Sequence, residues 1–515
     1  MVKQTETAVL LSNVVKRFGR VVANDKVSLE VRRGEILALL GENGSGKTTL
    51  MNMLSGIYYP DEGQIFVNGQ EVRIGSPKDA FSLGIGMIHQ HFKLVDVLTA
   101  AENIILGLPG KAKINRAALA GEIREISQKY GFRVDPNKKI YNMSVSEKQT
   151  VEIIKVLYRG ADILILDEPT AVLTPQETDR LFDVLRKMKA DNKAIIIITH
   201  KMHEVLSVSD RVAILRKGQV VGTVETKDAN RQNLTEMMVG HAVSLKINRP
   251  QPAENGQEAL KIEGLTCLNS DGIKALDNVS FTLRSGEIMG VAGIAGSGQK
   301  ELCEAITGLC PVQQGAICLS RPEGENLNIV GLTPTEIIRS GISMAFVPED
   351  RLGMGLVASM DIVDNTMLKS YKIGKGPFLD RKTPRALAKD IVGSLEIVTP
   401  GLNAPVRLLS GGNVQKVLLG REIASKPMVL IAAYPVRGLD INSSYRIYDL
   451  LNEQKKKGVA VLYIGEDLDV LLELCDWIIV LCGGRVSGIL DASQATKEEI
   501  GLKMTHIDAL KEADL

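Results

Sequence analysis

The chain alternates between short apolar runs and longer stretches that have one apolar face. Residues 163–166 and 195–198 are continuous runs of isoleucine and leucine of strand length, whereas residues 177–189 space their apolar side chains as one face of a helix. The same alternation returns at residues 428–431 and 459–464. Strands that alternate with helices predict a largely parallel sheet covered by helices, with loops at the strand ends that can hold a ligand. We therefore expect an α/β fold.

The pattern also repeats within the chain. Residues 25–46 (DKVSLEVRRGEILALLGENGSG) align without gaps on residues 277–298 (DNVSFTLRSGEIMGVAGIAGSG), at an offset of 252 residues. Further along, the stretch that begins at Ser144 matches the stretch that begins at Ser410, at an offset of 266 residues. The second copy therefore carries a net insertion of 14 residues between the two stretches. An internal repeat of this length predicts two domains of the same fold.

A polar segment separates the two copies. Residues 248–258 (NRPQPAENGQE) contain two prolines and a glycine and show no hydrophobic period, which is typical of a linker. The full length of 515 residues also exceeds what one hydrophobic core usually organises. We expect a first domain over residues 1–247, a linker over 248–258 and a second domain over 259–515.

Composition narrows the classes of function. The chain has 62 Lys and Arg residues against 61 Asp and Glu residues, and a net charge of +1 gives no field that would gather nucleic acid or anionic lipid. The first residues lack the pattern of a signal peptide, and no apolar run approaches the ~20 residues that span a bilayer. We expect a soluble chain that is not exported. We also expect reduced thiols at Cys267, Cys303, Cys310, Cys318, Cys475 and Cys482.

A phosphate-binding loop follows the first apolar run of the repeat. Residues 41–49 (GENGSGKTT) match the pattern G-x-x-x-x-G-K-[ST], directly after the apolar run 36–40. Glycines let backbone N–H groups curl around phosphate oxygens, and the following helix presents its positive end. We expect Lys47 near the β and γ phosphates and the Thr48 hydroxyl on magnesium. The expected phosphate-binding residues are Gly41, Glu42, Asn43, Gly44, Ser45, Gly46, Lys47, Thr48 and Thr49.

Two carboxylates end the strand at residues 163–166. Asp167 is expected to hold magnesium through water, and Glu168 to polarise the attacking water as a general base. The next strand runs from 194 to 199 and ends at His200, from where a polar group can reach the γ-phosphate. The first copy thus contains a complete set of groups for hydrolysis of a bound nucleotide.

With these motifs in place, the sequence resembles the ATP-binding cassette (ABC) family over nearly its whole length. The resemblance implies two P-loop domains in tandem, each with a mainly parallel sheet, an antiparallel β region and a helical subdomain. It also implies ATP and Mg²⁺ as ligands. Gln90 would contact magnesium and water, and Asp167 and Glu168 would form the Walker B pair. His200 would be the switch histidine, and Phe18 would stack on adenine, although packing in the core is an equal alternative for one Phe near a strand.

The second copy has lost these groups in a consistent way. Gln299 and Lys300 stand where the P-loop lysine and threonine are needed, and Ala433 and Tyr434 replace the two carboxylates. Glu466 occupies the histidine position, and residues 348–351 (PEDR) stand in the Gln-loop region. We expect a degenerate site whose P-loop comprises Gly293, Gly296, Ser297, Gly298, Gln299 and Lys300.

The signature motif of the family shows the opposite distribution. The second copy carries it nearly intact as Ser410, Gly411, Gly412 and Asn413, after Leu409. In the first copy, Ser144 is kept, but Ser146 replaces a glycine and Glu147 adds a negative charge. In the family each ATP lies between the P-loop of one domain and the signature of the other. The degenerate elements then all belong to one site, and the other site is complete.

Fused cassettes with GSGQKE, PEDR and LSGGN look like the motor subunits of bacterial importers for simple sugars and nucleosides. The sequences HQHF (89–92) and AAYP (432–435) look more like the nucleoside branch, which uses a lipoprotein receptor. The resemblance implies two permease subunits as partners, an indirect extracytoplasmic binding lipoprotein, no nucleic acid, and a peripheral position on the cytoplasmic face of the cell membrane. The alternatives are a ribose or galactose importer, a soluble tandem ABC translation factor, and a scaffold that binds nucleotide without hydrolysing it.

Overall fold

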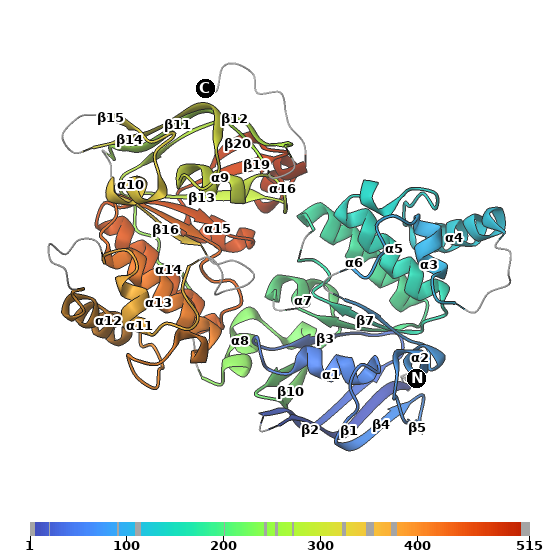
Figure 1. Cartoon of the computed structure of the whole chain (residues 1–515). Helices are drawn as coiled ribbons and strands as arrows, with labels where there is room; N and C mark the ends of the chain where they lie inside the picture. Colours follow the sequence, from blue (N-terminus) through green and yellow to red (C-terminus); the bar gives the residue numbers. More distant parts are fainter. Residues whose placement is uncertain are drawn as a thin grey trace. The chain divides into compact units, whose positions relative to one another are not determined.

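The computed structural model divides the chain into two compact units, Met1–Ser244 and Leu245–Leu515 (Figure 1). Each unit is described by itself. The structure describes residues 6–19, 21–89, 92–108, 115–171, 173–199, 201–241, 245–252, 256–269, 272–321, 326–346, 355–371 and 379–505.

A six-stranded sheet forms the centre of the first unit, with the strand order β10-β9-β3-β8-β7-β6. All neighbours are parallel except the β9–β10 pair. The continuous isoleucine and leucine runs are explained by burial, because every residue of β3, β7 and β8 is buried. The strands are β3 (Ile36–Leu40), β6 (Ile85–Ile88), β7 (Ile163–Asp167), β8 (Ala194–Ile198), β9 (Arg211–Arg216) and β10 (Gln219–Glu225).

An antiparallel sheet packs against the first sheet through one continuous core. Its strand order is β2-β1-β4-β5, and residues such as Val9 and Val14 share a buried cluster with Leu37 and Ile196 of the central sheet. Helix α1 contributes Leu50 to the same cluster. The strands are β1 (Thr7–Phe18), β2 (Val21–Arg32), β4 (Glu62–Val67) and β5 (Gln70–Val72).

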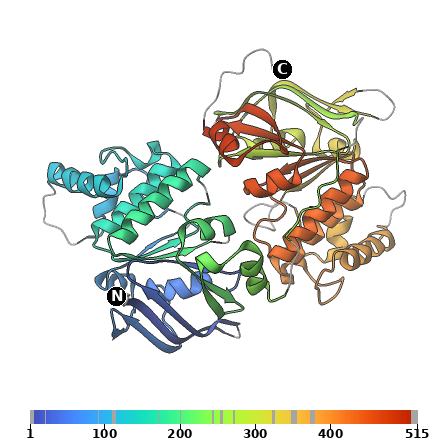
Figure 2. The ribbon, with the colours of Figure 1, turned by 180° about the vertical axis from the view of Figure 1, so that it is seen from behind.

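Helices α3, α4 and α5 gather on the side of the central sheet away from the antiparallel sheet (Figures 1 and 2). They form a separate small core that includes Ile104, Ile123 and Ile154. The helices of the first unit are α1 (Lys47–Leu54), α2 (Pro77–Ser82), α3 (Ala100–Ile105), α4 (Arg116–Tyr130), η1 (Ile140–Asn142), α5 (Val145–Tyr158), α6 (Pro175–Ala190), α7 (Met202–Val208), η2 (Thr226–Asp228) and α8 (Arg231–Val239).

The second unit repeats this architecture strand for strand. Its sheets have the orders β16-β17-β18-β13-β19-β20 and β12-β11-β14-β15. The six-stranded order, read from the opposite edge, and the four-stranded order both match those of the first unit with the corresponding strands substituted. The predicted fold class is thereby confirmed. The strands are β11 (Glu258–Leu268), β12 (Lys274–Arg284), β13 (Ile288–Gly293), β14 (Val312–Ser320), β15 (Asn326–Asn328), β16 (Ile342–Phe346), β17 (Val429–Ala433), β18 (Ala460–Ile464), β19 (Trp477–Cys482) and β20 (Arg485–Asp491).

The helices of the second unit occupy the corresponding places. They are α9 (Gln299–Ile306), α10 (Pro334–Arg339), α11 (Ile362–Met367), α12 (Lys382–Ser394), η3 (Val406–Leu408), α13 (Gly411–Ala424), α14 (Ile441–Lys456), α15 (Leu468–Leu474) and α16 (Lys497–Thr505). Among the described residues of the chain, no helix combines the length and the apolar character needed to cross a bilayer. All six cysteines are free thiols, as predicted.

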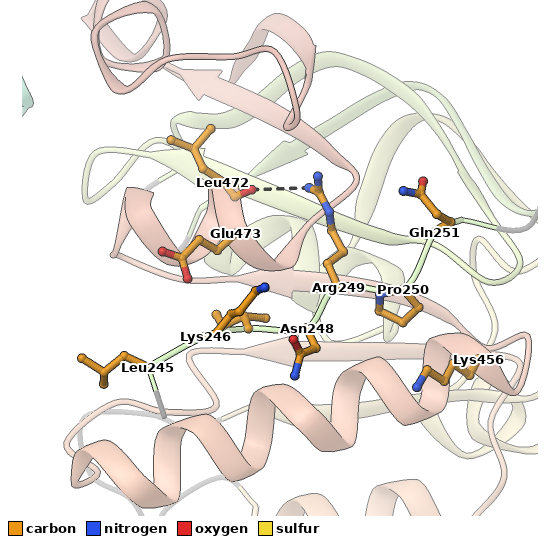
Figure 3. Close-up of a pocket in the computed structure, with 10 residues that line it drawn as sticks. Leu245, Lys246, Asn248, Arg249, Pro250, Gln251, Lys456, Leu472 and Glu473 are labelled. Atoms are coloured by element: carbon orange, nitrogen blue, oxygen red, sulfur yellow. Dashed lines mark hydrogen bonds between the residues drawn. The ribbon is translucent and has the colours of Figure 1, made fainter. Parts of the chain in front are cut away.

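The segment that joins the two units lies along the second unit (Figure 3). The side chain of Ile247 is buried in the second unit's core, and the Tyr445 hydroxyl donates to the Leu245 carbonyl at 3.1 Å. The Arg249 guanidinium donates to the carbonyls of Leu472 and Cys475. Residues 245–251 line an open pocket of about 780 Å³ together with residues of α14 and α15. The division into units falls three residues before the predicted end of the first domain, and the predicted boundaries remain predictions.

This joining segment covers a buried ion pair. Lys455 and Asp476 lie 2.7 Å apart with side chains only 1% and 5% exposed, and Lys455 also donates to the Pro250 carbonyl. The corresponding pair in the first unit, Lys189 and Asp210, has no such cover within the described chain, and its side chains are 36% and 34% exposed. The same ion pair is therefore a surface feature in one unit and an interior feature in the other.

We predict that Asp476→Asn destabilises the second unit strongly. The substitution leaves the Lys455 ammonium buried without a counter-charge, which typically costs about 3–5 kcal/mol. Asp210→Asn is the matched control, since loss of a pair exposed to water costs about 0–1 kcal/mol. Urea unfolding followed by the fluorescence of Trp477, the only tryptophan of the chain, measures the second unit, and circular dichroism measures both. Equal effects of the two substitutions would contradict the role of the covering segment.

Candidate active site

The phosphate-binding loop of the first unit connects β3 to α1. Gly46 precedes α1 in the left-handed conformation, with φ of 100°, and a Cβ atom there would lie 2.3 Å from the carbonyl oxygen of Ala23. A Cβ atom at Gly41 would lie 2.3 Å from the carbonyl oxygen of Leu215. Both positions therefore require glycine for the loop to pack so closely. The result is a tight turn at the start of a helix, the kind of position where backbone N–H groups can bind an anion.

Lys47 is the first residue of α1, and its side chain reaches back to the start of this loop. Its side chain is 7% exposed, and its ammonium donates to the carbonyls of Gly41 at 2.6 Å and Glu42 at 2.9 Å. Burial lowers the pKa of Lys47, and the nearby charges of Glu168 and Asp167 oppose that shift. The adjacent Thr48 side chain is exposed. The ammonium is thus placed beside the loop that would surround a phosphate.

A hairpin braces the loop from outside. The N–H of Gly218, between β9 and β10, donates to the Ser45 carbonyl at 3.0 Å, and the fully buried Asn24 amide donates to the Gly46 carbonyl at 3.2 Å. The second unit keeps the hairpin contact, from Gly484 to Ser297, but has Leu276 at the position of Asn24. Sequence reasoning did not identify Asn24. A buried asparagine replaced by leucine in the second copy is the signal that could have shown it.

The two carboxylates lie at the end of β7. The pKa of Asp167 is raised to about 6, mainly by burial and also by the charge of Glu168, while the charge of Lys47 opposes the shift. Glu168 has φ of 47°, which is rare for a residue with a side chain, and its N–H donates to the Ile198 carbonyl at 2.9 Å. Such conformations persist where the surrounding structure imposes them. The predicted pair is thus held at the end of a buried strand with Lys47 near enough to shift the Asp167 pKa.

The expected residues Gln90 and His200 lie outside the described residues, but the structure describes the residues that follow Gln90 from Phe92 onward. The peptide of Lys93, three positions after Gln90, is held by α5 at both ends. Glu152 accepts from its N–H at 2.7 Å, and Lys155 donates to its carbonyl at 3.2 Å. Glu152 and Lys155 also form an ion pair at 2.8 Å, and Glu152 is only 3% exposed. Sequence reasoning missed this attachment of the Gln-loop to the signature helix.

Phe18 is 43% exposed at the end of β1, so it is not part of the core. Its ring meets that of Tyr58 edge to face, with centroids 5.1 Å apart, and the Lys16 ammonium lies 5.5 Å from its centre. An exposed ring favours the expected stacking on a base over the alternative of core packing. The stacking itself stays a prediction.

The two signature segments differ at the helix start. In the first unit, Ser144 and Glu147 form a capping box on α5, with bonds of 2.7 and 3.2 Å, and Lys138 forms an ion pair with Glu147 at 2.7 Å. Partial burial raises the pKa of Glu147, but the Lys138 and Ser144 bonds outweigh burial and lower it. The first-turn N–H groups of α5 are therefore partly occupied by the chain's own side chains.

Among the described residues of the second unit, no side chain caps the start of the signature helix α13. In the described part of that unit, the Ser410 hydroxyl accepts no bond from a backbone N–H of the first turn of α13. It accepts instead from the side-chain amide of Asn413 at 2.9 Å. The helix then begins with Gly411 and Gly412, whose lack of side chains leaves the backbone donors accessible. This arrangement fits the prediction that the second signature, and not the first, faces a phosphate.

The degenerate site keeps the backbone conformation of the first site but lacks its functional side chains. Gln299 is 6% exposed and donates to the Ile294 carbonyl at 3.2 Å, as Lys47 does to the corresponding Glu42 carbonyl, while Lys300 points to Glu304 at 3.7 Å. Tyr434 has φ of 52° and donates its N–H to the Ile464 carbonyl at 2.8 Å, which repeats the geometry of Glu168.

The remaining positions of the degenerate site carry other side chains. Ala433 is fully buried beside Tyr434, and Glu466 forms an ion pair with Arg437 at 3.5 Å. The pKa of the Tyr434 hydroxyl is raised to about 12, mainly by burial and also by the charge of Glu466. Neither a magnesium ligand nor a base stands at the Walker B position. Residues 348–351 lie outside the described residues.

Comparisons with known proteins match the chain over nearly its whole length. The family described as ABC transporter matches residues 24–171 and 276–436, one segment in each unit. The nucleoside import ATP-binding protein NupA of Lactococcus lactis subsp. cremoris (strain MG1363) is 43% identical, over 97% of this chain and 98% of that protein. The guanosine import ATP-binding protein NupO of Bacillus subtilis (strain 168) is 42% identical over 97% of each. The ribose import ATP-binding protein RbsA 1 of Rubrobacter xylanophilus (strain DSM 9941 / JCM 11954 / NBRC 16129 / PRD-1) is 40% identical, over 95% of this chain and 96% of that protein.

We predict that Lys47→Ala abolishes ATP hydrolysis, because the P-loop then lacks the ammonium that neutralises phosphate charge. Gln299→Ala is the matched control in the corresponding position of the second unit and should leave hydrolysis nearly unchanged. Release of inorganic phosphate, measured for both variants at saturating ATP and Mg²⁺, checks the expectation. Near-normal turnover of Lys47→Ala would mean that the site is assigned to the wrong unit.

Proposed function

Because the chain belongs to the ABC transporter family and is an ATPase of that family, we propose that it is the energy-coupling subunit of a bacterial importer of nucleosides. The observation that carries the proposal is the match over almost the full length to the nucleoside and guanosine import proteins, which extends through both cassettes. The motifs HQHF and AAYP favour the same branch. The expected resemblance to ABC importer motors is confirmed by these relatives.

In the proposed site, the first unit supplies the chemistry. The close-packed P-loop and the buried Lys47 suit a phosphate chain, and the buried Asp167, whose pKa is raised by burial and by the charge of Glu168, suits a cation. Mg²⁺, when bound, would neutralise the charge that develops on the β and γ phosphates. Thr48, Asp167 and Gln90 are the residues proposed to hold it.

Glu168 is proposed as the general base. Its rigid backbone, fixed by the bond to Ile198, would hold the carboxylate against the attacking water, and His200 would contact the γ-phosphate from the end of the next strand. Phe18 is proposed to stack on the adenine. The phosphate side of the site is proposed to be completed by the Ser410, Gly411, Gly412 and Asn413 signature of a second cassette.

The other pairing, the degenerate P-loop with the first signature, is proposed to be catalytically inactive. This pairing lacks the groups for phosphate binding, for metal binding and for general-base catalysis, since Gln299, Ala433 and Tyr434 replace the lysine and the two carboxylates. The helix start at Ser144 is also already capped by the chain's own side chains. Groups that act as one catalytic unit do not contribute additively, so restoring one of them restores little. One working site per tandem chain is therefore proposed.

The proposed partners are two permease subunits in the cytoplasmic membrane, with a substrate-binding lipoprotein acting through them. The segment after Gln90 is the proposed docking surface. Val95 and Val97 are 40% and 66% exposed, and the buried Asn103 amide fixes the segment by bonds to both the N–H and the carbonyl of Val95 at 2.7 and 3.1 Å. Leu94, in contrast, packs against the helical core. Val97 thus fits the docking hypothesis, and Leu94 fits the alternative of internal packing.

A sugar is the second candidate substrate. The ribose import relative matches nearly the whole chain at 40% identity, only slightly below the nucleoside import relative. The motor is the same in both cases, and the difference concerns the permease and the receptor.

We predict that Glu168→Gln lowers both ATP hydrolysis and nucleoside uptake by on the order of 10²–10⁴, because the shape of the side chain is kept and the base is lost. The test uses the chain assembled with its permeases and receptor in proteoliposomes, and measures phosphate release and uptake of radiolabelled guanosine, with ribose as the competing substrate. Uptake of ribose and not of guanosine would overturn the nucleoside proposal and leave the motor proposal intact.

The matched variant in the second unit is Tyr434→Glu. It restores a carboxylate on a backbone of the same geometry, and we expect no gain in activity. A clear gain in this variant, or high residual activity in Glu168→Gln, would contradict the proposal of one working site.

We predict that Val97→Asp uncouples transport, because a charge in an apolar docking surface weakens the contact with the permease while the nucleotide site is untouched. Basal ATP binding should stay normal, and substrate-stimulated hydrolysis and uptake should fall. Val221→Asp, at an exposed valine of β10 in the same unit, is the control. Equal effects of the two variants would show that the loss reflects general surface damage and not docking.

A further inference from the structure

A buried carboxylate on α7 is hydrogen-bonded to residues that follow two neighbouring strands of the candidate active site, β7 and β8. Glu204 is 5% exposed, and its two oxygens accept hydrogen bonds from two threonine hydroxyls, Thr170 at 2.5 Å and Thr199 at 3.2 Å. Both threonines are themselves buried, at 0% and 1% exposure. No role in nucleotide binding or in hydrolysis assigned above involves any of these three side chains.

Lys201 completes the cluster. Its ammonium lies 3.2 Å from Glu204 and donates to the Thr170 carbonyl at 3.1 Å, and its backbone N–H donates to the Thr199 hydroxyl at 3.1 Å. The two strand ends are thus tied to each other and to the first turn of α7. A charge buried this deeply is costly unless it is paired and hydrogen-bonded, and here the hydroxyl donors and the ammonium meet that requirement.

The position of the cluster relates it to catalysis. Thr170 is two residues after Glu168, and Thr199 is the residue before His200. The strands that carry them, β7 and β8, are already paired in register, but the loops that follow those strands have no ladder to hold them. Glu204 supplies a bond to each loop from a third element.

The second unit offers an internal comparison. At the positions that correspond to Thr170, Thr199, Lys201 and Glu204, the second copy has Val436, Gly465, Asp467 and Val470. The space beside Gly465 is filled by the Tyr463 ring, since a Cβ atom there would lie 2.7 Å from that ring. The carboxylate and both hydroxyls are therefore absent from the copy that lacks the catalytic carboxylates. Tyr463, Val470 and Val436 belong there to one apolar cluster, and Asp467 caps α15.

Other buried polar contacts are kept in both copies. Glu35 accepts from the Arg32 N–H at 2.6 Å, and the corresponding Glu287 accepts from the Arg284 N–H at 2.6 Å. The fold thus retains a buried carboxylate where it serves the backbone in both units. Loss of the Glu204 cluster together with the catalytic groups points to a role in catalysis and not in folding.

We propose that Glu204 is a positioning residue for hydrolysis, which fixes the loop after Glu168 relative to the strand end before His200 through its bonds to Thr170 and Thr199. The proposal rests on the proposed roles of Glu168 and His200. Glu204 does not touch the nucleotide. Without it, both strands would still form, but the loop after Glu168 and the end of β8 at Thr199 would no longer be held at one separation.

The test compares Glu204→Val, the residue of the second unit, with Glu204→Gln in the full chain assembled with its permeases. A misplaced catalytic group commonly costs about 10- to 100-fold in turnover, so kcat for Glu204→Val should fall by that range, with the Kd for MgADP measured by calorimetry unchanged. Glu204→Gln can bond both hydroxyls and should recover most of kcat. A fall in kcat with no recovery in Glu204→Gln, or an equal loss of MgADP affinity, would overturn the positioning role.

Thr170→Val serves as a second variant that removes one bond and keeps the volume, and it should lower kcat without changing the Kd. Glu35→Val is the control for loss of a buried carboxylate, and should lower the melting temperature with kcat of the folded protein kept. Full activity in both Glu204→Val and Thr170→Val would refute the inference. The Glu168→Gln variant separates the two proposals. If Glu168→Gln is active, the proposed site is refuted. If Glu168→Gln is inactive and Glu204→Val is fully active, only the positioning role of Glu204 is refuted.

Discussion

The parallel pairing of β3, β8 and β7 is the constraint on which the candidate active site depends. Ile198 is in register with Leu39 of β3 on one side and with Asp167 of β7 on the other. Because parallel strands end at the same edge of a sheet, this register brings the P-loop, the two carboxylates and Thr199 to one edge. The Ile198 carbonyl then fixes Glu168 in its unusual conformation. The P-loop, the two carboxylates and Thr199 all lie at the ends of these three buried strands.

The second unit shows how little of the chemistry the fold itself requires. Tyr434 adopts the backbone conformation of Glu168, and the Gln299 amide donates to a loop carbonyl in the manner of Lys47. What disappears is the set of charged or hydroxyl side chains that would contact a nucleotide or position those that do. Stability depends on buried apolar area and satisfied backbone groups, which both units retain, so the catalytic groups of one unit can be lost without loss of the fold.

Sequence reasoning reached the parts of the molecule that local pattern determines. The α/β class, the tandem repeat, the P-loop and the Asp167–Glu168 pair all follow from motifs of a few residues or from periodicity. It did not reach Asn24, Glu152 or Glu204, because their partners are 22, 59 and 34 positions away in the chain and the pairing exists only after folding. For the same reason it could not separate the packed Leu94 from the exposed Val97, which lie in one short segment.

The segment that joins the units has a consequence for how such a tandem chain can change over generations. Polarity and prolines are typical of a connection that tolerates insertion, deletion or a chain break. Here Ile247 is a core residue of the second unit, and the Pro250 carbonyl is a ligand of the Lys455 ammonium. A gene split placed inside residues 246–250 would remove part of that interior, whereas a split before Leu245 would leave it whole. The second cassette thus depends on the connection left by the fusion, and this dependence opposes a return to two separate genes divided within that segment.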